Sequence, residues 1–379
     1  MIEAAKAGFA VLVRGFFEVH WSNLLMIVVG AFMIYLAVKK DVEPILLVTM
    51  GFSCILVNIP LSDLMEEGGF FRLIYEAGIT TELFPLLIFV GIGAMTDFGP
   101  LLERPYTFLL GGAGQCGIFL TLLLALALGF SFKEAVAIGV IGACDGPTAI
   151  YVSSKYAPEL LGAVSVAAYS YMSLVPIIQP PIMRLLTTER ERVTVMKIAK
   201  PTVSKTTKVL FPVVITLIGG FIAPKGLPLI GSLMLGNFLK ECGVVDRLSK
   251  AAQNEIANIV TLLLGIAIGG TMSGPNFVRP QTLMVLGLGF IAICLDTVCG
   301  LLLGKLMYAL TGGKVNPLIG AAGLSAFPMS ARVVQREGQK YNPKNYLIMH
   351  AMAANTGGQV GSVIAAAIML SVLQGMGIG

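Results

Sequence analysis

Several long stretches of this chain contain no charged side chain at all, among them residues 21–38, 106–132 and 160–183. About 20 mostly apolar residues are enough for a helix to cross a bilayer. Over the whole chain 56% of the residues are hydrophobic and 12% are charged, whereas soluble domains carry about 25% charged residues. The sequence therefore predicts an all-α polytopic membrane protein.

Seven of the 26 basic residues gather in one loop between two of the apolar stretches. These residues are Arg184, Arg190, Arg192, Lys197, Lys200, Lys205 and Lys208. Because basic loops stay on the cytoplasmic side, residues 184–208 are predicted to be a cytoplasmic linker. Its place between two membrane segments argues against a nucleic-acid partner. Residues 1–20 are interrupted by charges, which excludes a signal peptide and predicts an amphipathic helix lying on the membrane.

The sequence also argues against two common kinds of site. The six cysteines show no CxxC or other metal-ligand spacing and mostly lie in apolar stretches, so they are interpreted as small buried residues. The chain has only two histidines and no GxxxxGK[ST] loop. Neither a histidine-rich metal site nor nucleotide hydrolysis is expected.

One apolar stretch, residues 316–332, has the unusual sequence NPLIGAAGLSAFPMSAR. Glycine and proline interrupt the backbone hydrogen bonds of a helix, and the freed carbonyls need new partners. At membrane depth such backbone is tolerated only against protein or around a polar cavity. The stretch predicts an interrupted helix at a polar site; the alternative is a glycine-rich packing helix with a few hydrogen-bonding side chains.

The same pattern occurs earlier in the chain. Residues 139–152, GVIGACDGPTAIYV, overlay residues 320–333, GAAGLSAFPMSARV, with two glycines, a proline and a valine in register. The chain is therefore predicted to be an internal duplication, with membrane repeats at 21–183 and 209–379. Each repeat contains about five to six apolar segments, including one discontinuous or re-entrant segment. Inversion of the repeats requires an odd number of crossings, and parallel repeats remain the alternative; paired broken segments favour inversion.

Asp145 is the most unusual residue of the first interrupted segment, because a carboxylate within the membrane costs several kcal/mol unless it is paired or coordinated. One interpretation is a structural ion pair with an arginine or lysine of another helix. The other is a cation or proton site, in which the following Gly-Pro frees carbonyl oxygens beside the carboxylate. Carboxylate, carbonyl and amide oxygens are the ligands that a hard cation prefers.

Four more residues are candidates for the same chemistry. Asn316 offers an amide oxygen and Ser325 a hydroxyl, although each alone is more often a packing residue. Arg332 could lie at the membrane interface or hold a carboxylate with its planar fork. Tyr171 could be an interfacial tyrosine, a hydroxyl ligand or a proton donor. Weaker candidates are the polar residues near apolar stretches, Asp97, Asp296, Gln115 and His350.

Two strings, DGPTAI from residue 145 and NPLIGAAGLSAFPMSAR from residue 316, resemble the β-subunits of the biotin-dependent, sodium-pumping decarboxylases. The resemblance extends from about residue 20 to the end of the chain. It implies an enzyme subunit that decarboxylates carboxybiotin, consumes a proton and exports sodium ions. It also implies a multi-pass protein of the bacterial inner (plasma) membrane.

The resemblance assigns roles to individual residues. It implies sodium ligands at Asp145 and Asn316, with Gly320 close by, and a second sodium site or proton path at Tyr171 and Ser325. Arg332 falls on an arginine implicated in coupling, and we expect it to face carboxybiotin. The implied catalytic residues are Arg332 and Tyr171.

The implied partners are a biotin carrier protein that supplies carboxybiotin, a carboxyltransferase subunit, a small membrane subunit and further copies of this chain, all beside membrane lipid. The competing hypothesis is a sodium-coupled secondary carboxylate transporter of similar duplicated architecture. A purely structural membrane anchor is the weakest hypothesis, because an anchor has no need for Asp145.

Overall fold

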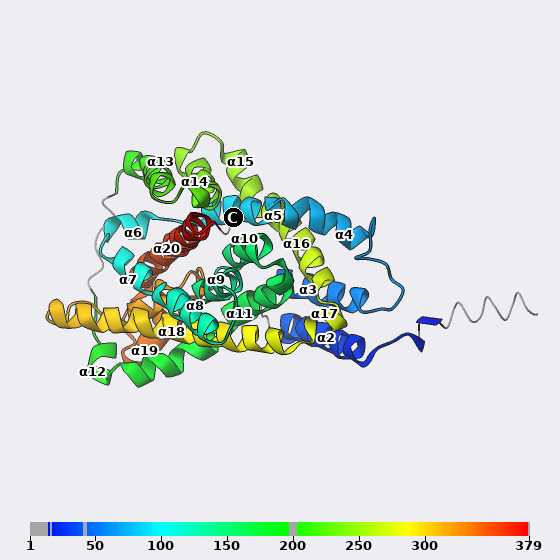
Figure 1. The fold of residues 1–379 in the computed structure, drawn as a ribbon. Coiled ribbons are helices and arrows are strands. Elements are labelled where there is room, and N and C mark those ends of the chain that lie inside the picture. The colour runs from blue at the N-terminus through cyan, green and yellow to red at the C-terminus, as the bar shows by residue number, and fades with distance from the viewer. Residues whose placement is uncertain (1–13, 16, 41–43, 197–202, 378–379) are drawn as a thin grey trace, which may run out of the picture.

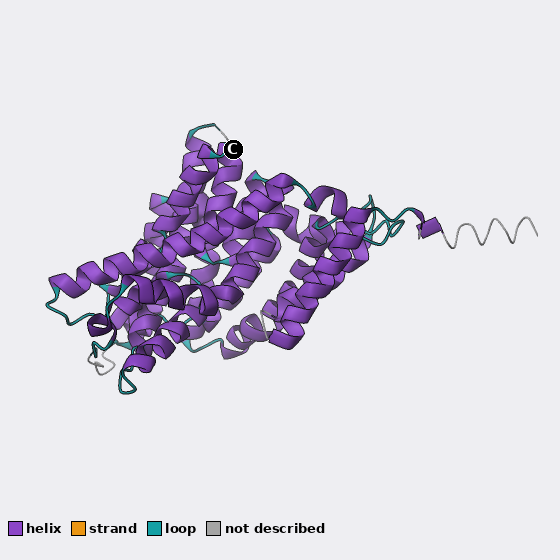
Figure 2. Cartoon of the chain, turned by 90° about the horizontal axis from the view of Figure 1, so that it is seen from below, coloured by secondary structure: helices purple, strands orange, loops and turns teal. Residues whose placement is uncertain are grey.

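The structure, a computed structural model, describes residues 14–15, 17–40, 44–196 and 203–377 of the chain. All regular elements in these residues are helical, which confirms the predicted all-α class (Figures 1 and 2). The predicted amphipathic helix at residues 1–20 falls mostly outside the described residues.

The elements before the basic linker are α2 (Trp21–Lys40), α3 (Pro44–Val57), α4 (Phe70–Tyr75), the π-helical turn η1 (Glu76–Thr80), α5 (Leu83–Met95), α6 (Gly99–Glu103), α7 (Thr107–Ala113), α8 (Cys116–Ala127), α9 (Phe132–Gly139), the 3₁₀ segment η2 (Val140–Ala143), α10 (Gly146–Tyr156), η3 (Pro158–Leu160) and α11 (Leu161–Leu186). The linker contains α12 (Glu189–Arg192).

The elements after the linker are α13 (Lys205–Ile222), η4 (Pro224–Gly226), α14 (Leu227–Cys242), α15 (Asp246–Ala251), the π-helical turn η5 (Ala252–Ile256), α16 (Ala257–Thr271), α17 (Gly274–Phe277), α18 (Pro280–Leu310), the 3₁₀ segment η6 (Pro317–Gly323), α19 (Met329–Tyr341) and α20 (Ile348–Gly375).

Among the described residues, seven helices are long and apolar enough to cross a membrane. An eighth candidate is the pair 70–80 and 83–95, which bends by 62°. Other apolar segments form shorter helices, such as α3, or are broken. The protein is a multi-pass membrane protein that combines long helices with interrupted ones.

The two halves of the chain contain similar elements in the same order and pack across each other. α3 of the first half packs against α16 of the second, and α14 of the second packs against α5 of the first. Each half also places a π-helical turn before its α5 or α16 helix. This order is compatible with the predicted duplication, while the duplication itself and its inversion stay predictions.

Glycines allow the closest of these contacts. A Cβ atom on Gly93 of α5 would lie 1.9 Å from the carbonyl oxygen of Leu233 in α14, and one on Gly236 of α14 would lie 1.9 Å from the carbonyl oxygen of Val90 in α5. Any larger side chain would therefore push the two backbones apart, because packed interiors leave little free volume.

The basic linker marks one end of the molecule, which we call the basic end. There Lys305 Nζ donates to the carbonyl oxygen of Leu186, 2.9 Å away, so α11 and α18 finish side by side. The guanidinium of Arg192 stacks on the ring of Tyr341, 4.4 Å from its centroid. α11 continues past the predicted repeat boundary at 183 and ends at Leu186. The cytoplasmic location of this end stays a prediction.

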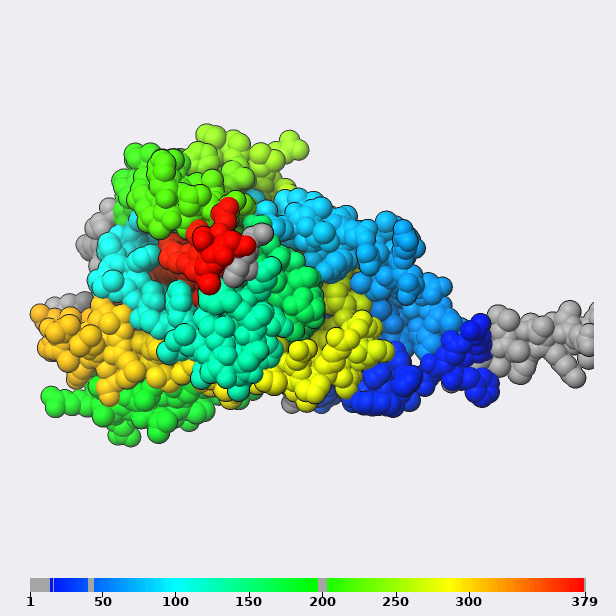
Figure 3. All heavy atoms as spheres, viewed as in Figure 1, coloured from blue at the N-terminus to red at the C-terminus, as the bar shows by residue number. Residues whose placement is uncertain are grey.

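The last helix, α20, begins beside the basic end and traverses the molecule. Its C-terminal part emerges between α13–α14 and α8–α9 in the space-filling view (Figure 3). Most of its side chains are buried, so α20 is the central helix against which α7, η6 and α19 pack.

The α5–α14 contact can be tested with two glycines of one helix. We expect Gly236→Ala to lower the thermal stability of the detergent-solubilised protein by on the order of 1–3 kcal/mol, the usual range for overpacking. Gly231, also in α14, has no atom within 4 Å of its potential Cβ. Gly231→Ala is the matched control and should be neutral or slightly stabilising, because alanine favours helix over glycine. Equal melting temperatures for both variants would contradict this packing.

A second test concerns the ion pair between Glu337 of α19 and Arg184 of α11, with Nε–Oε1 and Nη2–Oε2 distances of 2.6 and 3.0 Å. Burial acts to raise the pKa of Glu337, but the hydrogen bonds from Arg184 and Lys340 outweigh it and hold the pKa below its usual value of 4.5. A carboxyl group with a lowered pKa in the folded state contributes stability above its unfolded pKa, and this is lost as pH falls through its folded pKa.

We therefore expect Glu337→Gln to lower the melting temperature most near neutral pH, and the difference from the parent protein to shrink as pH falls below 4.5. Glu189→Gln, at an exposed carboxylate of α12, is the control and should have little effect at either pH. A difference that stays constant from pH 7 to pH 4 would rule out this contribution.

Candidate functional site

The first interrupted segment breaks at Cys144 and Asp145. After η2, Cys144 adopts a left-handed conformation with φ of 53°, and Asp145 is extended. Gly146 and Pro147 then start α10, because proline is well accommodated in a first helical turn. Asp145 consequently occupies the position just before the helix, with its side chain in the interior of the protein.

The second interrupted segment breaks after η6. Residues 324–328 link η6 to α19 and include a cis peptide bond between Phe327 and Pro328. The backbone N–H of Ser325 donates to the carbonyl oxygen of Ala143, 3.1 Å away. The two predicted interruptions therefore exist, and they meet through a direct hydrogen bond.

Asp145 is 3% exposed and is surrounded by neutral hydrogen-bond donors. Its Oδ2 accepts hydrogen bonds from Thr148 Oγ1 at 2.6 Å, Ser362 Oγ at 3.2 Å and Gln359 Nε2 at 3.4 Å. Within the described part of the chain it forms no ion pair with a lysine or arginine. The structural ion pair considered from the sequence is thus not found there.

Asp145 lines a cavity of about 230 Å³ where the broken segments face α3, α5, α11 and α16. Its other polar lining residues are Ser325, Gln359, Tyr169 and Thr261, and the remaining wall is mostly apolar. Carboxylate, amide and hydroxyl oxygens around a small cavity are suitable ligands for a hard monovalent cation.

Ser325 is the one other predicted sodium ligand that lies at this cavity. Its hydroxyl donates to the carbonyl oxygen of Gly358, 2.9 Å away, which ties the break to α20. The structure therefore brings Asp145 and Ser325 together, from opposite halves of the chain.

Asn316 and Gly320 lie elsewhere. Asn316 Nδ2 donates to the carbonyl oxygens of Arg192 at 3.0 Å and Thr194 at 2.8 Å, and its Oδ1 accepts from the N–H of Leu318. These bonds attach η6 to the linker at the basic end. A Cβ on Gly320 would lie 2.0 Å from the carbonyl oxygen of Gly300 in α18, so this glycine permits a close backbone contact.

Tyr171 does not line the cavity. Its hydroxyl donates to the carbonyl oxygen of Leu286 in α18, 2.6 Å away, and its ring meets that of Phe290 edge-on. Tyr169, two residues earlier on α11, lines the cavity and packs against Gly146. Because residues two apart on a helix point in different directions, only one of the two tyrosines can face Asp145.

Arg332 is the fourth residue of α19 and is exposed. It follows the break by one helical turn, and α19 leads from the break to Tyr341 at the basic end. Among the described residues its guanidinium has no hydrogen-bond or ion-pair partner. It is therefore available to an anion that approaches between the basic end and the cavity.

The sequence argument missed three hydrogen-bond partners of Asp145, namely Thr148, Gln359 and Ser362. Thr148 follows Asp145 by three residues, and Gln359 and Ser362 are three apart on α20. The available signal was the run of polar and small residues NTGGQVGS in an otherwise apolar helix. That signal identifies a polar face of α20, but not which residue it meets.

Asp296 of α18 is a second buried carboxylate, 1% exposed, outside this cavity. Cβ atoms on Gly117 and Gly142 would lie 2.3 and 2.6 Å from its carboxylate oxygens. Asp296 thus packs against the start of α8 and against η2, on the first broken segment.

Comparison with known proteins identifies the family to which the chain belongs. Residues 22–373 match the family described as the β-subunit of Na⁺-transporting oxaloacetate decarboxylase. The chain is 50% identical to the β-subunit of glutaconyl-CoA decarboxylase from Acidaminococcus fermentans, over 95% of this chain and 96% of that protein. It is also 50% identical to the β-subunit of methylmalonyl-CoA decarboxylase from Veillonella parvula, over 95% of each chain.

The oxaloacetate decarboxylase β-chain of Klebsiella pneumoniae is 41% identical, over 96% of this chain and 99% of that protein. The family match covers both interrupted segments and nearly all of every long helix described above. The chain belongs to the family of the β-subunits of the sodium-transporting decarboxylases.

Proposed function

We propose that this chain decarboxylates carboxybiotin near the basic end and uses the reaction to export sodium through the Asp145 cavity. The observation that carries the proposal is a buried carboxylate with only neutral donors around it, at the meeting point of two broken segments. Family membership favours this function over a secondary carboxylate transporter, since the related chains are named as decarboxylase subunits.

The proposed sodium site consists of Asp145 and Ser325, with Gln359 as a further oxygen donor after rotation of its amide. A sodium ion would supply the positive charge that Asp145 lacks among its described neighbours. This supports the site because a buried carboxylate is destabilising unless it is paired or coordinated. Asn316, Gly320 and Tyr171 remain predicted ligands of a second site or of another conformation, since each makes other contacts here.

The proposed chemical step breaks the bond between the carboxyl carbon and the biotin nitrogen. The electron pair stays on that nitrogen, which takes up a proton, and carbon dioxide leaves. Arg332 would hold the carboxylate of carboxybiotin by a two-pronged hydrogen bond, since a guanidinium fits a carboxylate better than an ammonium does. Tyr171 is proposed to lie on the proton path and not to donate directly to biotin, because its hydroxyl is bound to Leu286 near the start of α18, away from the basic end.

The proposed partners follow from the same chemistry. Carboxybiotin has to be delivered by a biotin carrier protein and produced by a carboxyltransferase subunit. We also propose a small membrane subunit and assembly with further copies of this chain. Moving one charge against 100 mV requires about 2.3 kcal/mol, and decarboxylation is the proposed source of that free energy.

The sodium site is tested by Asp145→Asn in the assembled complex. The variant keeps the shape of the side chain but removes its charge, so sodium would meet neutral oxygens only. We expect sodium-dependent decarboxylation and sodium transport to fall together by at least tenfold, measured in proteoliposomes. Asp97→Asn is the control, because Asp97 lies outside the cavity and accepts from Gly99 and Lys208. Sodium activation like that of the parent in Asp145→Asn would make Asp145 a structural residue.

The role of Arg332 is tested by titrating carboxybiotin and sodium separately. Arg332→Lys should keep partial activity with an increased requirement for carboxybiotin, and Arg332→Ala should lose most activity, because lysine preserves the charge but not the fork. Arg336→Ala changes the next exposed arginine on α19 and should be close to the parent. If Arg332→Lys alters only the sodium response, Arg332 acts on the cation and not on carboxybiotin.

A further inference from the structure

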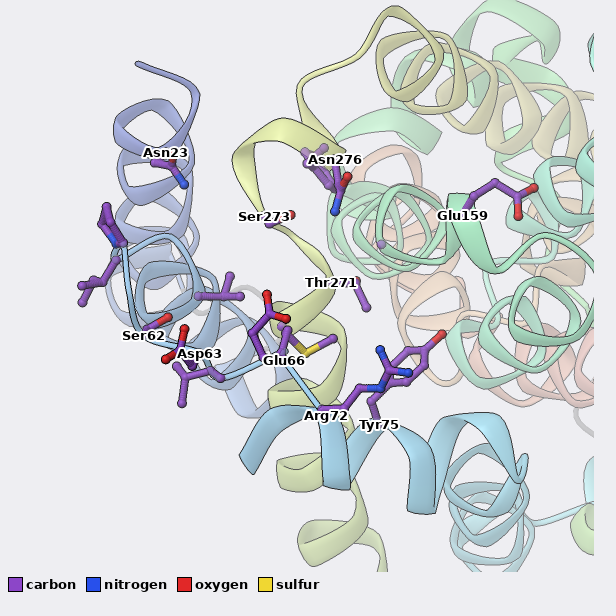
Figure 4. Close-up of a pocket in the computed structure, with 18 of the residues that line it drawn as sticks. Asn23, Ser62, Asp63, Glu66, Arg72, Tyr75, Glu159, Thr271, Ser273 and Asn276 are labelled. Atoms are coloured by element: carbon purple, nitrogen blue, oxygen red, sulfur yellow. The ribbon is translucent and has the colours of Figure 1, made fainter. Parts of the chain in front are cut away.

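A cavity of about 660 Å³, shown in Figure 4, lies at the first turns of α11 and α18, at the end of these helices opposite the basic end. Its walls are the 59–66 loop, α4, the starts of α11 and α18, and the junction of α16 with α17. α11 and α18 run from this cavity to the basic end, where they finish beside each other. The cavity and the basic linker are therefore on opposite faces of the protein.

This cavity is aligned with the Asp145 cavity along three shared helices. On α16 the smaller cavity is lined by Thr261 and the larger by Gly270 and Thr271. On α11 the corresponding residues are Tyr169 and Gly162. At about 1.5 Å per helical residue, the two cavities are separated by roughly 10–14 Å along α11 and α16.

A layer of buried apolar side chains separates the two cavities. Met50 of α3 and Ile268 of α16 pack in one cluster with Ile150 of α10 and Leu161 of α11. α3 and α16 are held tightly, since a Cβ on Gly269 would lie 2.5 Å from the carbonyl oxygen of Met50. Along α3 and α16, buried apolar residues therefore lie between the residues that line the Asp145 cavity and those that line the larger cavity.

The lining of the larger cavity favours cations. Three carboxylates line it, those of Asp63, Glu66 and Glu159, and none of them is in an ion pair with a described basic residue. Of the two lining arginines, Arg72 is neutralised by Glu76. The carboxylates leave an excess of negative charge, which concentrates cations in a cleft.

The loop that carries two of these carboxylates has a defined shape. Leu61 and Asp63 both have positive φ, 61° and 49°, a conformation that costs free energy unless surrounding contacts impose it. The N–H groups of Phe71 and Arg72 donate to the carbonyl oxygen of Leu64, at 3.0 and 3.1 Å. α4 therefore holds the backbone of this loop in place beside the cavity.

We propose that this cavity is the release vestibule for the exported cation, in which Glu66 and Glu159 bind sodium transiently after it passes the apolar layer. The proposal rests on the proposed function of the Asp145 cavity. It predicts that removing the charges of Glu66 and Glu159 changes how the decarboxylation rate depends on sodium on the release side. The dependence on sodium on the other side should not change.

The test uses the complete decarboxylase complex in proteoliposomes, with its biotin-bearing subunits outside, so that the vestibule faces the lumen. Initial decarboxylation rates are measured against lumenal sodium at fixed external sodium. The double substitution Glu66→Gln and Glu159→Gln should raise the half-inhibitory lumenal sodium concentration at least threefold, while activation by external sodium is unchanged. Glu67→Gln is the matched control, because Glu67 is exposed beside Glu66 and does not line the cavity.

A half-inhibitory concentration within twofold of the parent, or an equal shift in Glu67→Gln, would overturn the vestibule. A parent complex that decarboxylates without accumulating sodium would instead overturn the proposed function. As a second measurement, Ser62→Cys should react from the lumen with a cationic, membrane-impermeant thiol reagent several-fold faster than with an anionic one, after subtraction of the parent's native cysteines. Equal rates, or reaction only from the external side, would also contradict the proposal.

Discussion

The structure depends on hydrogen bonds to the backbone carbonyl oxygens of residues 321–324, where the second apolar segment is interrupted. Four successive carbonyl oxygens there accept hydrogen bonds from side chains: Gln179 donates to Ala321, Ser330 to Ala322, Gln115 to Gly323 and Asn355 to Leu324. Unsatisfied carbonyls in an apolar interior each cost several kcal/mol. Polar side chains of α11, α19 and α20, and of the turn before α8, thus make an interrupted helix possible where an unbroken one would otherwise be required.

These side-chain hydrogen bonds allow the two halves of the chain to meet at the second break. With its carbonyls satisfied, the second break offers the N–H of Ser325 to Ala143 in the first break. Asp145 follows two residues later and receives donors from α10 and α20. A carboxylate that would destabilise a regular membrane helix is tolerated here because its environment is a cavity lined by oxygen-bearing groups.

The position of this cavity links the two faces of the protein. α19 leads from the break to the basic end, where the linker and Asn316 are joined. In the opposite direction the shared helices lead through an apolar layer to a larger, acidic cavity. In the proposed function, carboxybiotin would react at the basic end and sodium would be released at the larger cavity. These two places lie at opposite ends of the same helices, with Asp145 between them.

The sequence by itself determined the membrane class, the two interrupted segments, the candidate roles of Asp145 and Ser325, and the family. These depend on local patterns, namely charge-free stretches, glycine and proline within them, and specific strings. Only the tertiary structure decided that Thr148, Gln359 and Ser362 surround Asp145, that Tyr169 and not Tyr171 faces the cavity, and that Asn316 binds the linker. The reason is physical: helix composition shows that a side chain is polar, whereas the packing of distant helices decides which polar group it meets.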